Sequence, residues 1–159
     1  KLMSIKEIIA LKDMVQGLAA DDCHLYLWTT NNYLPDALRV MEAWGFTYKT
    51  AITWTKDRFG LGQYYRGITE HCLFGVKGNL PYKTINGKRA QGTTLIQAPR
   101  GEHSRKPEEM RLMIERVSYP PYIELFARPH VGTLFQSQHW DFWGEEMSDA
   151  EGRPDENSL

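Results

Sequence analysis

An α/β fold is predicted by three features of this 159-residue sequence. Segments with helical periodicity alternate along the chain with short apolar runs of strand character. Gly and Pro residues separate these segments at the points where a helix or strand should begin or end. Apolar residues form 42% of the chain and aromatic residues 12%, enough to build the core of one ordinary domain. Such alternation is typical of a mostly parallel sheet that helices cover on both faces.

The N-terminal third predicts a helix, a strand and a second helix. A helix is expected over residues 4–18, which begin with the capping-box sequence SIKE and carry apolar residues near one face. The apolar run CHLYLWTT, residues 23–30, is suited to a buried strand. The second helix covers residues 33–45, with Pro35 in its first turn and Gly45 as its stop.

Five further strands and one helix are predicted in the rest of the chain. The helix begins at Pro107 and has acidic residues in its first turn and Arg116 near its end. The strands are expected from their β-branched, aromatic and apolar residues, and they cover residues 46–56, 70–78, 94–98, 122–127 and 139–144. The predicted fold is therefore α/β and Rossmann-like.

Two long segments do not fit this alternation. Residues 57–67, DRFGLGQYYRG, and residues 79–92, NLPYKTINGKRAQG, are rich in Gly and in basic and aromatic residues. Long connections without secondary structure are usually functional loops or disordered segments. Residues 148–159 are polar and acidic, and we expect a disordered tail there.

Composition excludes several classes of protein. The chain has 19 Lys and Arg against 20 Asp and Glu, so its total charge does not indicate a nucleic-acid or membrane partner, and a basic site has to be local. Cys23 and Cys72 lie in apolar runs without the spacing of a redox pair, which predicts reduced thiols and a cytoplasmic location. No membrane span, secretory pattern or set of metal ligands is evident in the sequence.

Charged residues are concentrated in the segment APRGEHSRKPEEM, residues 98–110. In an open α/β sheet, ligands bind beyond the carboxyl ends of the strands, which is where this segment should lie. The loop 57–67 and the sequence RPH, residues 128–130, follow other strands and should open on the same edge. Taken singly, the segment 98–110 is better explained as a solvated loop before a helix. Glu70 with His71 is likewise better explained as a strand start, and Arg128 with His130 as a capped surface turn. Their joint occurrence at one edge favours a functional site.

Four sequence blocks carry a resemblance to a known family. The segments LYLWTTNNYLPDALRVMEAWGF, TEHCLFGVKGN, APRGEHSRKPEEM and IELFARPHVG, followed by HWDFWGEE, resemble the S-adenosylmethionine-dependent adenine-N(6) methyltransferases. That family includes the catalytic subunit of the eukaryotic messenger-RNA adenosine methyltransferase and many bacterial and phage enzymes. The likeness runs from about Ser4 to Glu146 in the same order. It implies a class I methyltransferase sheet and a methyltransferase domain over residues 1–147.

The resemblance also implies roles for individual residues. Glu70 and Lys106 should be catalytic and lie near the substrate base, with Lys106 also able to reach the carboxylate of the cofactor S-adenosylmethionine. Further residues should bind the ribose and methionine parts of that cofactor, namely Arg128, His130, Glu145 and Glu146. Nucleic acid should meet a local basic surface made by Arg58, Arg66, Lys83, Lys88, Arg89, Arg100, Arg105 and Lys106.

The family's hallmark tetrapeptide, Asp-Pro-Pro-Trp, does not occur in this sequence. In the family it lies upstream of the segment that resembles MSIKEI, so we expect it upstream of Lys1. The expected activity is methylation of adenine N(6) in nucleic acid, with DNA preferred over RNA as in bacterial or phage enzymes. A homodimer or a related methyltransferase-like subunit is a candidate assembly. The alternatives are a catalytically silent scaffold that grips nucleic acid for an active partner, and a methyltransferase for small molecules.

Overall fold

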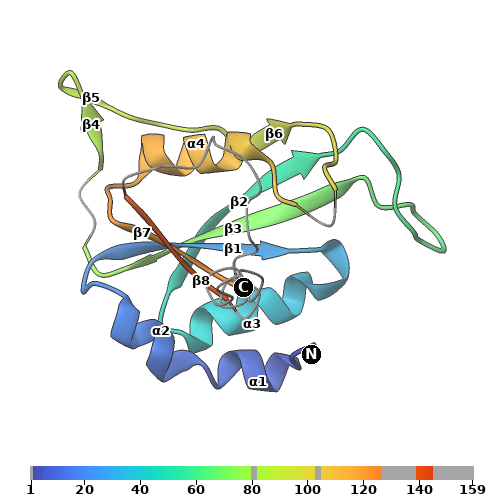
Figure 1. Cartoon of the computed structure of the whole chain (residues 1–159), viewed down its shortest axis with the longest axis horizontal. Coiled ribbons are helices and arrows are strands. Elements are labelled where there is room, and N and C mark those ends of the chain that lie inside the picture. The colour runs from blue at the N-terminus through green and yellow to red at the C-terminus, as the bar shows by residue number, and fades with distance from the viewer. Residues whose placement is uncertain (1, 80–81, 103–104, 127–138, 145–159) are drawn as a thin grey trace, which may run out of the picture. The chain divides into compact units, whose positions relative to one another are not determined.

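Four strands form the main sheet of the structure, a computed structural model that describes residues 2–79, 82–102, 105–126 and 139–144. The sheet has the order β1-β3-β2-β6 (Figure 1). Its strands are β1 (Cys23–Thr29), β2 (Thr47–Thr55), β3 (Thr69–Lys77) and β6 (Leu95–Gln97). The chain divides into two compact units, residues 1–118 and residues 119–159, and this sheet belongs to the first. The helices and strands of this unit confirm an α/β fold.

The expectation of a mostly parallel sheet is wrong, because most neighbouring strands of the main sheet pair in antiparallel. Strands β1, β2 and β6 share one direction, but β3 runs against them and lies between β1 and β2. Only β2 and β6 are parallel neighbours among the three adjacent pairs. The reason is the connection after β2, residues 56–68, which contains no helix. A parallel neighbour needs a crossover, whereas a loop returns the chain as an antiparallel partner.

The helix expected over residues 4–18 is divided into α1 (Ile5–Ile9) and α2 (Lys12–Leu18). Its predicted capping box is confirmed, because Ser4 and Glu7 each accept a hydrogen bond from the other's backbone N–H. The helix breaks because the Leu11 N–H bonds to the Ile8 carbonyl, three residues back, which tightens the chain there. The indole of Trp44 donates to that same carbonyl at 3.1 Å.

The second predicted helix is confirmed as η1 (Asn31–Tyr33), a single 3-10 turn, followed by α3 (Leu34–Ala43). Gly45 ends it with a φ of 90°, a conformation that favours glycine. Helix α3 packs on one face of the sheet. A Cβ atom at Gly75 of β3 would lie 2.7 Å from the Met41 sulfur, so the helix approaches the strand where the side chain is smallest.

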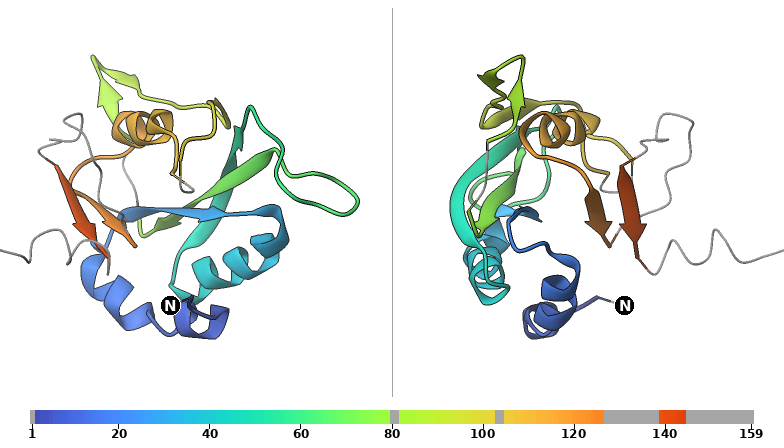
Figure 2. Two further views of the ribbon diagram at one scale, coloured as in Figure 1. Left: turned by 45° about the vertical axis from the view of Figure 1, so that its right-hand side comes forward. Right: turned by 90° about the vertical axis from the view of Figure 1, so that its left-hand side faces the viewer.

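Helix α4 (Glu108–Val117) covers the opposite face, so the expectation of helices on both faces is confirmed (Figures 1 and 2). Its Met110 joins a buried cluster drawn from three strands and the segment after β6, with Met113 and Ile114 packed against it. The sheet and loop members are Ile52, Trp54, Cys72, Ile96 and Ala98. This cluster fixes α4 over β2, β3 and β6 and thereby fixes the loop that precedes the helix.

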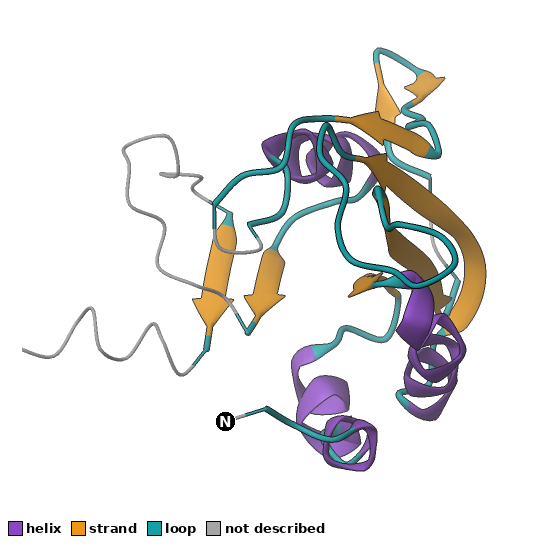
Figure 3. Cartoon of the chain, turned by 90° about the vertical axis from the view of Figure 1, so that its right-hand side faces the viewer, coloured by secondary structure: helices purple, strands orange, loops and turns teal. Residues whose placement is uncertain are grey.

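The expectation that residues 79–92 form a loop is wrong in part. Within them, β4 (Thr84–Ile85) and β5 (Lys88–Arg89) form a short hairpin. Asn86 and Gly87 turn the chain with φ values of 51° and 73°. Asn-Gly is the preferred sequence for such a two-residue turn, so the signal was present in the sequence. Residues 57–67, in contrast, contain no helix or strand, as expected (Figure 3).

The second unit contains two further strands, β7 (Tyr122–Leu125) and β8 (Trp140–Trp143), which pair in parallel. Both were expected from the sequence. The rings of Tyr122 and Trp140 stack with their centroids 4.8 Å apart. Over the described residues, no helix is long and apolar enough to cross a membrane. Cys23 and Cys72 are both free thiols, as predicted.

Candidate functional site

One edge of the main sheet brings together segments that are distant in sequence. Strands β1, β2 and β6 end at this edge and β3 begins there, because β3 alone runs in the other direction. The loops after β2 and β6 are tied together: the Arg58 guanidinium donates to the Arg100 carbonyl at 3.0 Å, and the Arg100 N–H donates to Asp57 at 2.7 Å. The prediction that these two loops open on one edge is confirmed. We call this edge the functional edge.

The carboxylate of Glu70, at the start of β3, is the centre of the functional edge. Its Oε1 lies 2.9 Å from Nζ of Lys106, and its Oε2 lies 3.1 Å from Nζ of Lys56. Glu70 is only 9% exposed, and the two lysine side chains are partly exposed, at 19% for Lys56 and 34% for Lys106. The structure therefore unites the two residues predicted to be catalytic, and it adds Lys56.

Electrostatics keep this carboxylate ionised. Burial acts to raise the pKa of Glu70, because it removes water from the charged form. The hydrogen bonds and charges of Lys106 and then Lys56 outweigh burial, and the pKa of Glu70 is lowered from its ordinary value. Glu70 is therefore an ionised hydrogen-bond acceptor at neutral pH, and its two ion pairs fix the orientation of the carboxylate.

Two tryptophan rings support the lysines. The ammonium of Lys106 lies 5.1 Å from the ring centroid of Trp28, and that of Lys56 lies 4.8 Å from the ring of Trp54. The two rings meet edge to face, with centroids 6.0 Å apart. The Trp54 indole is itself fixed, since it donates to the Ala98 carbonyl at 2.9 Å. These contacts hold the ammonium groups next to aromatic surfaces that favour cations.

A chain of hydrogen bonds fixes the start of β3 from its other face. Asn31 donates from its amide nitrogen to the Thr69 hydroxyl at 3.1 Å, so its amide oxygen is left to accept from His71 Nε2 at 2.7 Å. His71 Nδ1 in turn lies 3.0 Å from the Thr53 hydroxyl, within hydrogen-bond distance. This chain of hydrogen bonds anchors the backbone on both sides of Glu70.

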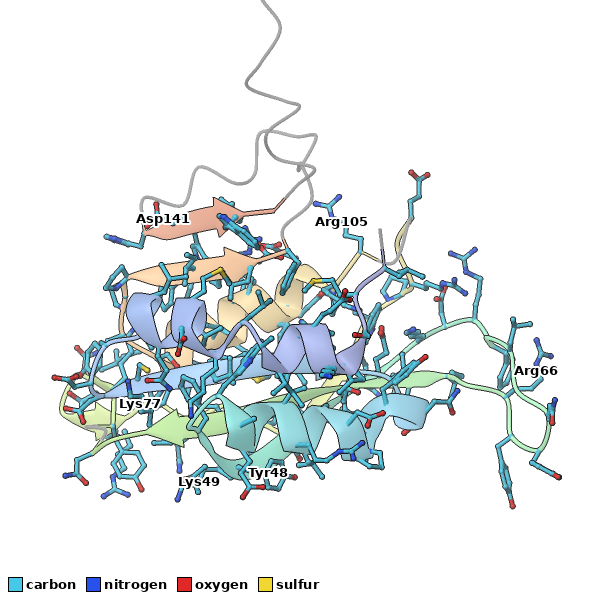
Figure 4. The ribbon with its side chains drawn as sticks, turned by 90° about the horizontal axis from the view of Figure 1, so that it is seen from below. Tyr48, Lys49, Arg66, Lys77, Arg105 and Asp141 are labelled. Atoms are coloured by element: carbon cyan, nitrogen blue, oxygen red, sulfur yellow. The ribbon has the colours of Figure 1, made fainter. Side chains whose placement is uncertain are left out.

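The loop 57–67 extends from the functional edge away from the sheet (Figures 1 and 2). Arg66 lies in it (Figure 4), where it donates to the Gly60 carbonyl at 3.3 Å and lies 5.2 Å from the ring centroid of Phe59. Tyr64 and Tyr65 are more than nine-tenths exposed. Arg58 lies in the same loop, and Arg100 and Arg105 lie in the segment between β6 and α4.

Three of the predicted nucleic-acid contacts lie elsewhere. Lys88 and Arg89 belong to the β4–β5 hairpin, and Lys83 precedes it. The Lys83 ammonium donates to the Glu115 carbonyl near the C-terminal end of α4, and the guanidinium of Arg89 lies 3.9 Å from the ring centroid of Tyr82. Lys106, by contrast, precedes the N-terminus of α4. A helix of 10 residues spans about 15 Å, so these groups do not form one continuous rim with the functional edge.

Four predicted cofactor contacts lie outside the described residues, namely Arg128, His130, Glu145 and Glu146. Lys56 was not among the residues predicted from the sequence, although a signal was present. Residues 52, 54 and 56 alternate onto one face of the strand and its extension, and Ile52 and Trp54 were expected in a buried strand. A lysine that continues a buried stripe at a strand end needs a counterion, and that counterion is Glu70.

Comparison with known proteins identifies related sequences over nearly the whole chain. The profile of the MT-A70 family matches residues 1–146. The type II methyltransferase M.MunI of a Mycoplasma species is 37% identical over an alignment 165 residues long, and this alignment covers 98% of this chain and 65% of that protein.

Plant and animal proteins match a shorter part. The human N(6)-adenosine-methyltransferase catalytic subunit METTL3 is 36% identical over an alignment 119 residues long, and this alignment covers 69% of this chain and 20% of the human protein. A rice protein, described as a probable N(6)-adenosine-methyltransferase MT-A70-like, is 36% identical over an alignment 115 residues long, which covers 67% of this chain and 16% of the rice protein. The chain thus spans just under two thirds of the first of these relatives and a fifth or less of the others.

Proposed function

The chain belongs to the MT-A70 family, and from this premise we propose that the protein transfers a methyl group from S-adenosylmethionine to the N(6) amine of adenine in nucleic acid. The observation that supports this most is the ionised carboxylate of Glu70, held between Lys106 and Lys56 at the functional edge. The names of the plant and animal relatives, which are N(6)-adenosine methyltransferases, agree with adenine as the target.

Glu70 would recognise the amine. The exocyclic nitrogen of adenine is a weak nucleophile because its lone pair is delocalised into the ring, so the enzyme must hold it in line with the methyl group. A carboxylate has about four acceptor positions, and the two lysines use only two of them in this structure. Glu70 therefore retains acceptor positions for the amine beside its lysine contacts.

Lys106 is suited to contact a ligand directly. Its side chain is the more exposed of the two lysines, and its ammonium can donate to a ring nitrogen of the base or to the cofactor's carboxylate. The described residues thus fit the cofactor at one point, a cation for its carboxylate. Arg128, His130, Glu145 and Glu146 are proposed to hold its ribose and methionine parts. When bound, S-adenosylmethionine supplies the electrophilic methyl group of its sulfonium.

We further propose that DNA is the preferred nucleic acid. The match to the Mycoplasma type II methyltransferase covers 98% of the chain, against 69% for the human enzyme, and this supports a bacterial or phage type. Arg58, Arg66 and Arg100 would contact phosphates, and the exposed Tyr64 and Tyr65 would stack on bases when the target adenine is turned out of the duplex. A second copy or a related subunit is the proposed partner, since relatives are named as subunits.

Mass spectrometry of nucleosides tests the activity. DNA and RNA are each incubated with S-adenosylmethionine and the full-length protein, and N(6)-methyladenine is expected in DNA above all. Methylated RNA alone would overturn the DNA preference. Salt-sensitive binding to nucleic acid without any methyl transfer would overturn the enzymatic proposal and support the scaffold alternative.

The variant Lys106→Ala tests the site. It should lower kcat/KM at least tenfold, which corresponds to about 1.4 kcal/mol or more of barrier. Lys49→Ala is the matched control, because Lys49 is exposed and lies in the first half of β2, whose other end reaches the functional edge. Full activity in Lys106→Ala would remove this residue from the catalytic assignment.

A further inference from the structure

Lys56 is the member of the functional edge for which the sequence comparison and the proposed chemistry give no role. It follows β2 directly, and its backbone N–H donates to the Ile68 carbonyl at 2.8 Å, which extends the pairing of β2 with β3 by one residue. Its ammonium lies over Trp54 and binds Oε2 of Glu70 at 3.1 Å. The backbone of Lys56 and its ammonium group are therefore both held in place.

The two lysines bind different oxygens of the Glu70 carboxylate. Lys106 binds Oε1 and belongs to the loop that leads into α4, whereas Lys56 binds Oε2 from the end of a central strand. Lys56 is also the less exposed of the two. If Lys106 turns to a ligand, Glu70 loses one of its two cations. The other cation remains because its own strand and Trp54 hold it.

We propose that Lys56 is a positioning residue, which keeps the Glu70 carboxylate ionised and correctly oriented while Lys106 engages substrate or cofactor. This inference rests on the proposed function of the functional edge, since it assigns Glu70 the role of acceptor for the amine. Lys56 itself acts through Glu70 and does not contact the reacting atoms.

The two lysines are the groups that keep the Glu70 carboxylate ionised. Among the described residues, the charged groups that act on its carboxylate are Lys106 and Lys56. Cys72 lies two residues further along β3, and burial raises the pKa of its thiol to about 12. That thiol is neutral under ordinary conditions. His71 points to the other face of β3, and Asp57 accepts from the backbone of Arg100. Removal of Lys56 would therefore leave Lys106 as the one cation beside Glu70 in the described part of the chain.

The test is the pH dependence of two measurements on Lys56→Met. The control is Lys49→Met, which makes the same substitution at an exposed position near the other end of β2 (Figure 4). The first measurement is kcat/KM for methyl transfer, and the second is the titration of the Glu70 carboxyl by carbon NMR. Since an opposite charge at this distance lowers the pKa of a carboxyl, its loss should move both the acidic limb of the rate profile and the NMR titration to higher pH by about one unit.

Lys56→Arg should restore both values towards those of the wild type, because it keeps the charge. Lys56→Gln replaces the Met variant if that variant does not fold. An unchanged Glu70 titration in the neutral variant that folds would overturn the inference. The NMR titration needs no turnover, so it still decides the role of Lys56 if the wild-type protein transfers no methyl group, a result that would count against the proposed function alone.

Discussion

Replacing Glu70 with glutamine removes one charge from the functional edge and keeps the shape of the side chain. In the wild type, each carboxylate oxygen binds one lysine ammonium, at 2.9 Å and 3.1 Å. A glutamine amide offers one oxygen and one NH2 group, so one of the two lysines would face a donor. Glu70→Gln should therefore leave a partly buried cation without an acceptor and destabilise the fold as well as the proposed chemistry.

The size of the effect follows from burial. A hydrogen bond to a charged group is worth about 1.5–3 kcal/mol, and a fully buried ion pair that loses one partner costs about 3–5 kcal/mol. Glu70 is nearly buried, but the lysine side chains are 19% and 34% exposed, so water recovers part of the loss. We expect Glu70→Gln to lower the free energy of unfolding by about 2 kcal/mol at pH 7.

The pH dependence gives the sharper test. Because the pKa of Glu70 is lowered in the folded state, its stabilising contribution is complete above the unfolded pKa of about 4.3 and is lost as the pH falls through the folded pKa. Urea unfolding, followed by tryptophan fluorescence, should therefore show a smaller difference between wild type and variant at about pH 4 than at pH 7.

The matched control is Glu42→Gln, an exposed carboxylate on α3. It should differ from the wild type by less than about 0.5 kcal/mol. A Glu70→Gln difference that is equally small, or that stays constant between the two pH values, would refute the assignment of an ionised, lysine-bound carboxylate.

Three other outcomes are expected. Gly75→Ala should lower the free energy of unfolding in urea by about 1–3 kcal/mol, because the new Cβ would lie 2.7 Å from the sulfur of the fully buried Met41. In native protein at about pH 8, a thiol reagent should modify Cys23 slowly and Cys72 not at all, since burial raises both pKa values and Cys72 is fully buried; mass spectrometry reads out the labelled residue. Neutralising Lys83, Lys88 and Arg89 should make a plot of log affinity for duplex DNA against log salt shallower by about 2 units. The expected change is not about 3 units, because the ammonium of Lys83 already binds the Glu115 carbonyl. An unchanged slope would exclude the hairpin from the interface.

The sequence predicted the identity and position of the helices and strands better than their arrangement. Periodicity and end signals act locally, as in the capping box at Ser4 and the stop at Gly45, and both are confirmed. The direction of β3 depends on how the chain returns through residues 56–68, which no local pattern records. The Ile8 carbonyl at the end of α1 likewise binds the Trp44 indole, 36 residues away, a contact that no local pattern records.

Some residues of the site were predicted from the sequence, but not the way in which they are grouped. Glu70 and Lys106 entered through the family resemblance, and the structure places their side chains 2.9 Å apart, while their catalytic roles stay predictions. Lys56 was missed because a lysine after a strand usually faces water, and only the antiparallel neighbour reveals its partner. The hairpin residues were grouped with the functional edge because sequence shows their charge but not the helix that separates them.

The antiparallel strand also explains how Glu70 reaches the functional edge. In a parallel sheet, a residue at the start of a strand lies at the opposite edge from the loops that follow the strands, so Glu70 and Lys106 would be separated by the length of β3. With β3 reversed, its first residues meet the ends of β1, β2 and β6, and Glu70 comes within 2.9 Å of Lys106. The central position of β3 adds a second advantage. Its neighbours on either side supply Trp28 and Trp54, the two rings that support the lysines. The reversed direction of β3 therefore brings Glu70 next to both lysines and both rings.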